Sequence, residues 1–142
     1  MPVRSADAVW EGDLKSGKGK VKLESGALEG QYSFSTRFES GKGTNPEELI
    51  AGAHAACYSM ALSVGLGKFG FVPTKISTTA KVTLDKVGDA FRITLIKLHT
   101  EAVVPKIDEK QFAQIAEGTK SACPVSVALS ATKIELEAKL VK

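Results

Sequence analysis

The chain alternates between stretches with the two-residue period of a β-strand and stretches with helical spacing. The clearest alternation lies near the C-terminus, where charged residues separate four apolar positions: Ile134, Leu136, Ala138 and Leu140. A strand with one buried face has this pattern. Similar alternation, bounded by turns such as Ser25–Gly26 and the one around Gly88, predicts five further strands. The six expected strands cover residues 3–11, 20–24, 27–38, 76–84, 91–103 and 133–140.

A long helix is expected between the third and fourth strands, over residues 45–67. Asn45 suits the N-cap and Pro46 the first helical position, and Glu48 falls where it can close a capping box back onto Asn45. Glycines at the far end indicate where the helix stops. Its middle, residues 51–56, is almost entirely alanine and glycine. Such a small surface lets another helix come close, so we expect it to pack in the interior or against a partner.

Two shorter helices are expected between the fifth and sixth strands. Asp108 and Gln111 form a capping box for the first, and Pro124 begins the second. The resulting order, βββ–α–ββ–αα–β, is an α+β fold with antiparallel sheets wrapped around the long central helix, in a single domain over residues 1–142. Neither group of strands alone has an obvious way to cover the long helix. We therefore expect an intertwined homodimer.

Composition and charge exclude several classes of function. Hydrophobic residues make up 43% of the chain and charged residues 25%, which is ordinary for a globular protein. The formal charge of +3 is small and the lysines are scattered, which argues against binding to nucleic acid. The N-terminus lacks the apolar run of a signal peptide, and no continuous stretch of 18 apolar residues predicts a membrane span. We therefore expect a soluble, cytoplasmic protein with no membrane partner.

The chain has two cysteines, Cys57 in the long helix and Cys123 before the short one. In a reducing cytoplasm, such a pair indicates catalysis, redox sensing or two inert buried side chains. Because Pro124 favours the first helical position, Cys123 is expected at an N-cap, where backbone N–H groups and the helix dipole favour a thiolate. Cys57 lies in mid-helix and needs a cation from elsewhere. Local electrostatics therefore predict that Cys123 is the more acidic thiol.

Three other side chains are candidates for chemistry. Arg37 carries a permanent charge that can stabilise a thiolate, although arginines near strand ends are often only solvated. Glu47 lies roughly 80° from Cys57 around the helix and about 15 Å from it along the axis. If Glu47 serves the site of Cys57, it does so from a second copy of the chain; otherwise it is a favourable charge at a helix N-terminus. His54 packs near the thiol or the helix interface, since a metal site with both cysteines lacks a recognisable fourth ligand.

Several short motifs follow one another along nearly the whole chain. They are WEGD at 10–13, TRFE at 36–39, GTNPEELIAGAHAACYSMALS at 43–63, LDKV at 84–87, VP at 104–105 and CPVS at 123–126. In these motifs the sequence resembles the OsmC/Ohr family of thiol-dependent peroxidases, most closely the branch of the osmotically inducible protein C. The block NPEEL…AAC with a later CPVS is the specific part of this resemblance.

The resemblance implies a fold, an activity and a set of site residues. Family members are intertwined homodimers whose two antiparallel central helices are clasped by sheets. They reduce organic hydroperoxides, and hydrogen peroxide to a lesser degree, without a metal or a bound organic cofactor. Matched by position, Cys57 corresponds to the peroxidatic cysteine and Cys123 to the resolving one. Arg37 and Glu47 correspond to the residues that hold and activate the thiolate. These roles reverse the electrostatic prediction, because Arg37 then supplies the charge that the helix of Cys57 lacks.

The resemblance also implies a mechanism. Cys57 attacks the peroxide, releases an alcohol and becomes a sulfenic acid, which Cys123 traps as a disulfide within the same chain. A dithiol donor, lipoyl-type in the family, reopens that disulfide by exchange. Apolar residues expected near Cys57, including Phe38, Ile50 and Met60, favour an alkyl peroxide as substrate. Two alternatives stay open: a thiol redox sensor or binding protein with slow turnover, and a structural dimer with inert thiols.

Overall fold

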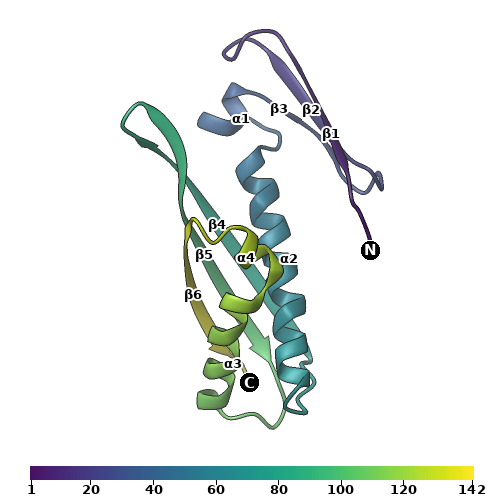
Figure 1. Cartoon of the computed structure of the whole chain (residues 1–142), viewed down its shortest axis with the longest axis vertical. Helices are drawn as coiled ribbons and strands as arrows, with labels where there is room; N and C mark the ends of the chain where they lie inside the picture. The colour runs from purple at the N-terminus through teal and green to yellow at the C-terminus, as the bar shows by residue number, and fades with distance from the viewer. The chain divides into compact units, whose positions relative to one another are not determined.

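The computed structural model describes all 142 residues, which form two compact units, Met1–Leu49 and Ile50–Lys142. Each unit contains one three-stranded sheet, in which the strands neighbour one another in chain order. Along the chain, two helices follow the first sheet, and two more lie between the last two strands of the second sheet (Figure 1). Helices and strands in this order make an α+β arrangement. The predicted fold class is therefore confirmed at this level.

The first unit is an antiparallel meander of three short strands: β1 (Ala6–Glu11), β2 (Lys18–Leu23) and β3 (Glu29–Tyr32). Trp10 and Tyr32 contact each other across it, with ring centroids 5.6 Å apart. Gly19 lies between these rings, and a Cβ added there would fall 2.6 Å from the ring of Tyr32 and 2.7 Å from that of Trp10. The central strand therefore needs glycine at this position for the aromatic side chains to close over it.

The prediction of a third strand as far as residue 38 is wrong. After Tyr32 the chain enters a short helix, α1 (Phe34–Phe38). The Ser33 hydroxyl accepts from the Thr36 amide, and the Thr36 hydroxyl accepts in turn from the Ser33 amide. This reciprocal cap satisfies two backbone donors at the helix start and outweighs the strand preference of the neighbouring aromatic residues. The helix carries Arg37 in its last turn.

The long helix α2 (Pro46–Gly67) has the predicted bounds. At its start, the Glu48 amide donates to Asn45 Oδ1 over 2.7 Å, as the capping residues predict. By length and composition alone, α2 is apolar enough to cross a membrane. This qualifies the expectation that no segment predicts a span, although the core helix of a soluble protein passes the same test.

The second sheet also corrects the prediction, because it is not wholly antiparallel. It contains β4 (Lys75–Val87), β5 (Ala90–Val103) and β6 (Lys133–Leu140). Strands β4 and β5 form an antiparallel hairpin, whereas β6 pairs with β5 in parallel. Between β5 and β6 the chain passes through two helices: α3 (Glu109–Ala122) and α4 (Pro124–Ala128). These helices carry the chain back along the sheet, so that the next strand starts from the same end as β5.

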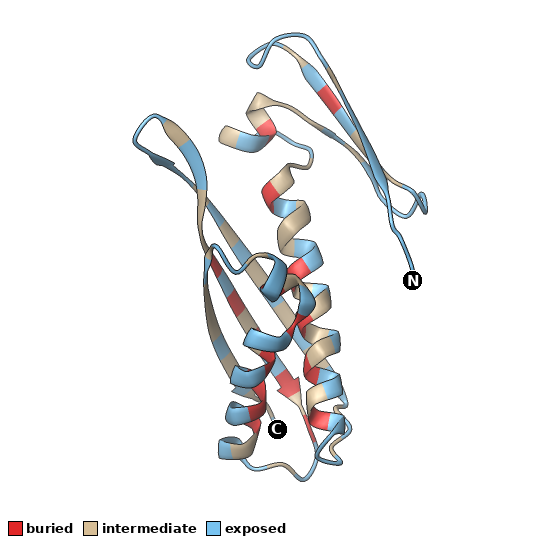
Figure 2. Cartoon of the chain, viewed as in Figure 1, coloured by how far each residue is buried: buried red, intermediate tan, exposed pale blue.

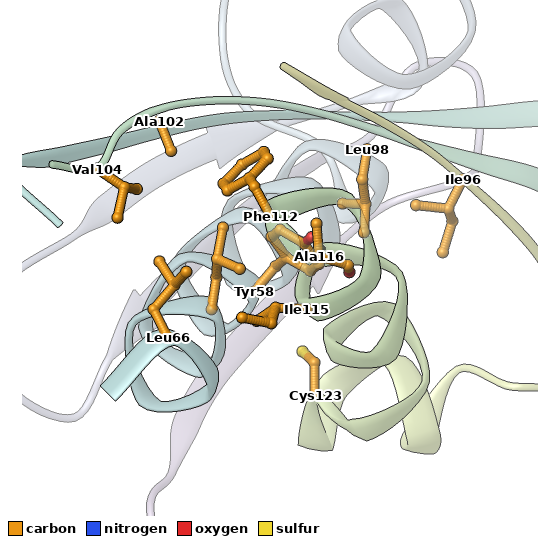
Figure 3. Packing of buried hydrophobic residues seen from close by; sticks show 11 residues of the cluster. Tyr58, Leu66, Ile96, Leu98, Ala102, Val104, Phe112, Ile115, Ala116 and Cys123 are labelled. Carbon is orange, nitrogen blue, oxygen red and sulfur yellow. Dashed lines mark hydrogen bonds between the residues drawn. The ribbon is translucent and has the colours of Figure 1, made fainter. Parts of the chain in front are cut away.

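The hydrophobic core of the second unit lies between the sheet and helices α2 and α3. Figure 3 shows side chains from all three elements pointing toward one another, and Figure 2 shows the buried positions along them. The core includes Tyr58, Leu62 and Leu66 of α2, Ile96, Leu98 and Ala102 of β5, and Phe112, Ile115 and Ala116 of α3. The Tyr58 hydroxyl donates to the Ala116 carbonyl over 2.9 Å, which ties α2 to α3.

Close contact between α2 and α3 depends on a small residue. A Cβ added at Gly65 would lie 3.2 Å from both Ile115 Cγ2 and Thr119 Oγ1. Nine in ten ordinary Cβ contacts are longer, so an added Cβ would require Ile115 or Thr119 to shift by a few tenths of an ångström. This packing matters for the site, because α3 ends where the second cysteine begins α4.

Candidate active site

The two cysteines, 66 residues apart in sequence, lie side by side in the second unit. Cys57 lies in the middle of α2, and Cys123 occupies the junction of α3 and α4. Their Sγ atoms are 3.1 Å apart, and both thiols are free. A disulfide bond measures about 2.0 Å, so the sulfur atoms are in contact but not bonded. Cys123 is completely buried and Cys57 is partly exposed, so solvent reaches the pair from the Cys57 side.

Local structure explains the position of Cys123. Its amide donates to the Thr119 carbonyl and closes α3, while its carbonyl accepts from the Val127 amide and opens α4. Pro124 occupies the first turn of α4, as the sequence predicts, and Cys123 is the N-cap. Proline has no amide to leave unsatisfied at this position. The sulfur therefore lies at the amino end of α4, where the backbone N–H groups have no partners within the helix.

The two thiols differ in acidity although they touch. Burial raises the pKa of Cys123, but hydrogen bonds from the Ser126 amide, the Cys57 thiol, the Ser126 hydroxyl and the Val125 amide outweigh burial and lower it below its usual value. Burial raises the pKa of Cys57, and the neighbouring charge of Cys123 raises it further, with only the Val125 amide opposing. Within one chain, Cys123 is the more acidic thiol, as local electrostatics predict.

Arg37 and Glu47 form an ion pair within the first unit. Arg37 donates from Nε and Nη2 to Glu47 Oε1, over 3.1 and 2.8 Å. The Glu47 side chain is only 9% exposed, and its Oε2 is buried without a partner. Asn45 Nδ2 donates to the Thr36 carbonyl and so fixes α1 against the start of α2. The two residues, selected separately from the sequence, thus form an ion pair between the exposed Arg37 guanidinium and the buried Glu47 carboxylate, whose second oxygen has no partner.

A second polar contact joins α2 to α4 and involves Ser126, which the sequence analysis did not single out. His54 Nε2 lies 2.7 Å from Ser126 Oγ, and both side chains are buried. His54 Nδ1 has no partner, and burial lowers the pKa of this imidazole. The signal for Ser126 was its place in the third position of α4, where its amide points toward the N-cap. No group of three or more His, Cys, Asp or Glu side chains is placed to bind a metal.

Comparison with known proteins decides the family. The family model described as OsmC-like protein matches residues 39–138. The chain belongs to the OsmC family. It is 57% identical over 129 residues to Peroxiredoxin OsmC of Escherichia coli (strain K12), covering 90% of each protein. It is 27% identical over 87 residues to an organic hydroperoxide resistance protein of Xanthomonas axonopodis pv. citri, covering 61% of this chain and 59% of that protein.

The fold is also that of the OsmC family. The organic hydroperoxide resistance protein OhrB of Bacillus subtilis superposes with a TM-score of 0.74 at 20% identity, over 96% of this chain and 98% of that chain. The segment matched as OsmC-like includes Glu47 and both cysteines, and it begins two residues after Arg37. The resemblance found in the sequence motifs is confirmed, whereas the roles of the individual residues stay predictions.

Proposed function

We propose that this OsmC-family protein is a thiol-dependent peroxidase that reduces organic hydroperoxides to alcohols, and hydrogen peroxide more slowly. The observation that carries the proposal is the contact between two free thiols, with 3.1 Å between their Sγ atoms. The 57% identity to Peroxiredoxin OsmC of Escherichia coli supports a peroxidase, and the organic hydroperoxide resistance protein among the relatives supports an organic substrate. The chemistry uses neither a metal nor an organic cofactor.

In the proposed reaction, the Cys57 thiolate attacks the distal peroxide oxygen. The O–O bond breaks, the alcohol leaves after taking up a proton, and Cys57 becomes a sulfenic acid. The Cys123 thiolate then attacks Cys57 Sγ and displaces hydroxide, which leaves as water. The disulfide so formed requires the sulfur atoms to approach from 3.1 Å to about 2.0 Å. Partial exposure of Cys57 lets a substrate reach it, while burial of Cys123 reserves that thiol for the second step.

The raised pKa of Cys57 means that its reaction needs a cation, and we assign that role to Arg37, held by Glu47. Cys57 lies ten positions after Glu47 in the helix, which is about 15 Å along the axis. The proposed site therefore combines Cys57 of one chain with the Arg37–Glu47 pair of a second copy, in a homodimer. An exposed stripe of small and apolar residues on α2 supports this assembly: Gly52, Ala53, Ala56, Met60 and Val64.

A groove between α2 and α3 continues this stripe and fits the same partner. It is lined by Val64, Gly65 and Phe69 on one side and by Ile115, Gly118 and Ala122 on the other. Phe69 is 62% exposed in the single chain, a large apolar side chain that a second copy would cover.

To reduce the Cys57–Cys123 disulfide again, we propose a dithiol donor, of which lipoyl groups are one type. We also propose a cytoplasmic location, where reduced thiols persist.

The decisive experiment is thiol titration before and after one equivalent of cumene hydroperoxide, followed by peptide mapping. We expect the loss of two thiols per chain and a crosslink between Cys57 and Cys123. The Cys57→Ser variant, as control, should lose none to a single equivalent. Two free thiols after treatment of the unaltered chain would contradict the mechanism. A crosslink that forms without continuous consumption of hydroperoxide under excess dihydrolipoamide would instead favour a redox sensor.

A further inference from the structure

The proposed mechanism gives no role to the buried polar pair His54 and Ser126. Ser126 is the third residue of α4, the helix that Cys123 caps, and its amide and hydroxyl both lower the pKa of the Cys123 thiol. The same hydroxyl lies 2.7 Å from His54 Nε2. His54 is completely buried and Ser126 is 3% exposed. Burying polar side chains is costly unless they are hydrogen-bonded, and this pair is retained although His54 Nδ1 has no partner.

The donors and acceptors of His54 and Ser126 determine which of the two side chains donates the hydrogen bond. His54 Nδ1 is buried without a partner. If Nδ1 carried the proton, a donor would be buried unpaired, an arrangement that is rare in folded proteins. The proton therefore belongs on Nε2, from which His54 donates to the Ser126 oxygen. The single hydroxyl proton of Ser126 is then free to point at Cys123 Sγ. Donation runs one way, from imidazole to hydroxyl to sulfur.

We propose that His54 and Ser126 are positioning residues that hold Cys123 as the leaving-group thiolate during recycling, so that the dithiol donor attacks Cys57. This inference rests on the proposed function. A thiolate of the donor attacks Cys57 Sγ and forms a mixed disulfide, while the Cys57–Cys123 bond breaks and its electron pair leaves on Cys123. The second donor thiol then displaces Cys57. The donor is oxidised by two electrons to its disulfide, and the protein is reduced to two thiols.

Two further observations favour attack at Cys57. Disulfide exchange is faster when the departing thiol is the more acidic one, and Cys123 has the lowered pKa. Access points the same way, because Cys57 is partly exposed and Cys123 is completely buried. The other ionisable groups that act in this region are Cys57 and Tyr58 of α2 and Glu117 of α3. None of them can donate a hydrogen bond to Cys123 once it is bonded to Cys57, apart from Tyr58, whose hydroxyl is committed to the Ala116 carbonyl.

The first test identifies the attacked sulfur in the unaltered chain. The disulfide is formed with diamide, which needs no peroxidase activity, and is then opened with 2-mercaptoethanol. After acid quenching and labelling with N-ethylmaleimide, peptide mapping should find mercaptoethanol on Cys57 and maleimide on Cys123. The reverse pattern would overturn the proposal. If diamide forms the disulfide but a hydroperoxide does not, the proposed peroxidase function fails while this inference is still tested.

The second test separates positioning from packing. Ser126→Ala removes the hydroxyl and should slow reduction of the disulfide by dihydrolipoamide about three- to tenfold, whereas Ser126→Thr keeps it and should restore the rate. His54→Gln retains a donor at the Nε2 position and should resemble the unaltered chain, whereas the shorter His54→Asn should resemble Ser126→Ala. In a Cys57→Ser background, Ser126→Ala should also move thiolate absorbance at 240 nm to higher pH. Equal rates and equal titration across the folded variants would overturn the proposal; if Ser126→Ala does not fold, the peptide map decides.

Discussion

The thiols of Cys57 and Cys123 are in contact but differ in acidity, because they lie at different positions in their helices. Cys57 lies in mid-helix, where every nearby amide of α2 is already bonded within the helix. Cys123 lies at the amino end of α4, where the amides of Val125 and Ser126 lower the pKa of its thiol. Burial disfavours the charged form of both, yet the pKa of Cys57 rises and that of Cys123 falls. Position relative to unpaired backbone donors decides the acidity of a thiol here more than depth in the core does.

This difference in acidity fits the different roles proposed for the two cysteines. The chain itself stabilises the thiolate of Cys123, which is completely buried. It leaves Cys57 partly exposed and without a charge partner of its own, and in the proposed homodimer the Arg37–Glu47 pair of a second copy supplies that charge. A monomer would then be a poor peroxidase, and its partly exposed thiol would be protected from unwanted oxidation by its raised pKa.

Removal of the Cys57 sulfur should have the largest effect on turnover. Cys57→Ser deletes the proposed nucleophile, and we expect the steady-state consumption of cumene hydroperoxide to fall at least about a thousandfold. Coupled oxidation of dihydrolipoamide measures the rate, and circular dichroism checks that the variant is folded. Ser59→Ala, two residues further along the same helix, is a control for a small change in α2. Turnover that survives in Cys57→Ser would assign the reaction to the other sulfur.

The Cys123→Ser variant should break the cycle at a later step. Cys57 still reacts, so rapid mixing should show one equivalent of hydroperoxide consumed per chain, followed by a halt in the steady state. Dimedone should label the sulfenic acid that accumulates on Cys57. Steady-state loss with no burst and no label would contradict the assignment of Cys57 as the sulfur that reacts first.

The contrast between the sulfurs could be read only in part from the sequence. The N-cap position of Cys123 follows from Pro124, and helix bounds follow from caps such as Asn45, because these signals are local. The contact of Cys57 with Cys123, and of Ser126 with His54, depends on how α4 packs on α2. No spacing along the chain encodes that packing. The family resemblance assigned roles to the two cysteines, whereas the contact of His54 with Ser126 emerged only from the three-dimensional structure.

The errors in the predicted fold have the same origin. Residues 34–38 read as strand because of their aromatic residues, whereas the Ser33–Thr36 cap turns them into α1. The alternation in residues 133–140 identifies β6 but carries no information about its direction. Whether β6 runs parallel to β5 depends on the path of α3 and α4 between them. Periodicity therefore identified the elements well, and tertiary connections decided what they pair with.

Loss of the Arg37 charge should have a smaller effect than loss of either sulfur. Arg37→Met removes the proposed cation and keeps much of the side-chain volume, and we expect reaction of Cys57 with hydroperoxide to slow about a hundredfold. Glu47→Gln should have a weaker effect in the same direction, because it loosens the ion pair but keeps the guanidinium. Arg92→Met, at an exposed position of β5, is the matched control for the loss of a positive charge.

A mixing experiment shows whether the charge comes from a second copy. Cys57→Ser copies lack the nucleophile and Arg37→Met copies react slowly, but a mixed dimer contains one site with both an intact Cys57 and an intact Arg37 if the site is shared. Unfolding the two variants together and refolding them should therefore restore part of the activity. If Arg37 serves the Cys57 of its own chain, the mixture stays as slow as the Arg37→Met variant alone, and the proposal of a shared site is wrong.

The smallest expected effect is on stability at alkaline pH, and it tests the contrast between the sulfurs without any substrate. The pKa of Cys57 is raised from 9.0, so its stabilising contribution is complete below 9.0 and is lost as pH rises. The pKa of Cys123 is lowered from 9.0, so its contribution is complete above 9.0 and is lost as pH falls through the folded-state value. The test is the free energy of unfolding in urea between about pH 7 and pH 10, compared at one protein concentration with the variant that carries serine at both positions. Cys57→Ser retains Cys123 and should gain stability as pH rises. Cys123→Ser retains Cys57 and should lose stability as pH rises. Slopes of the same sign would mean that the helix start does not distinguish the two thiols, because burial alone would then govern both.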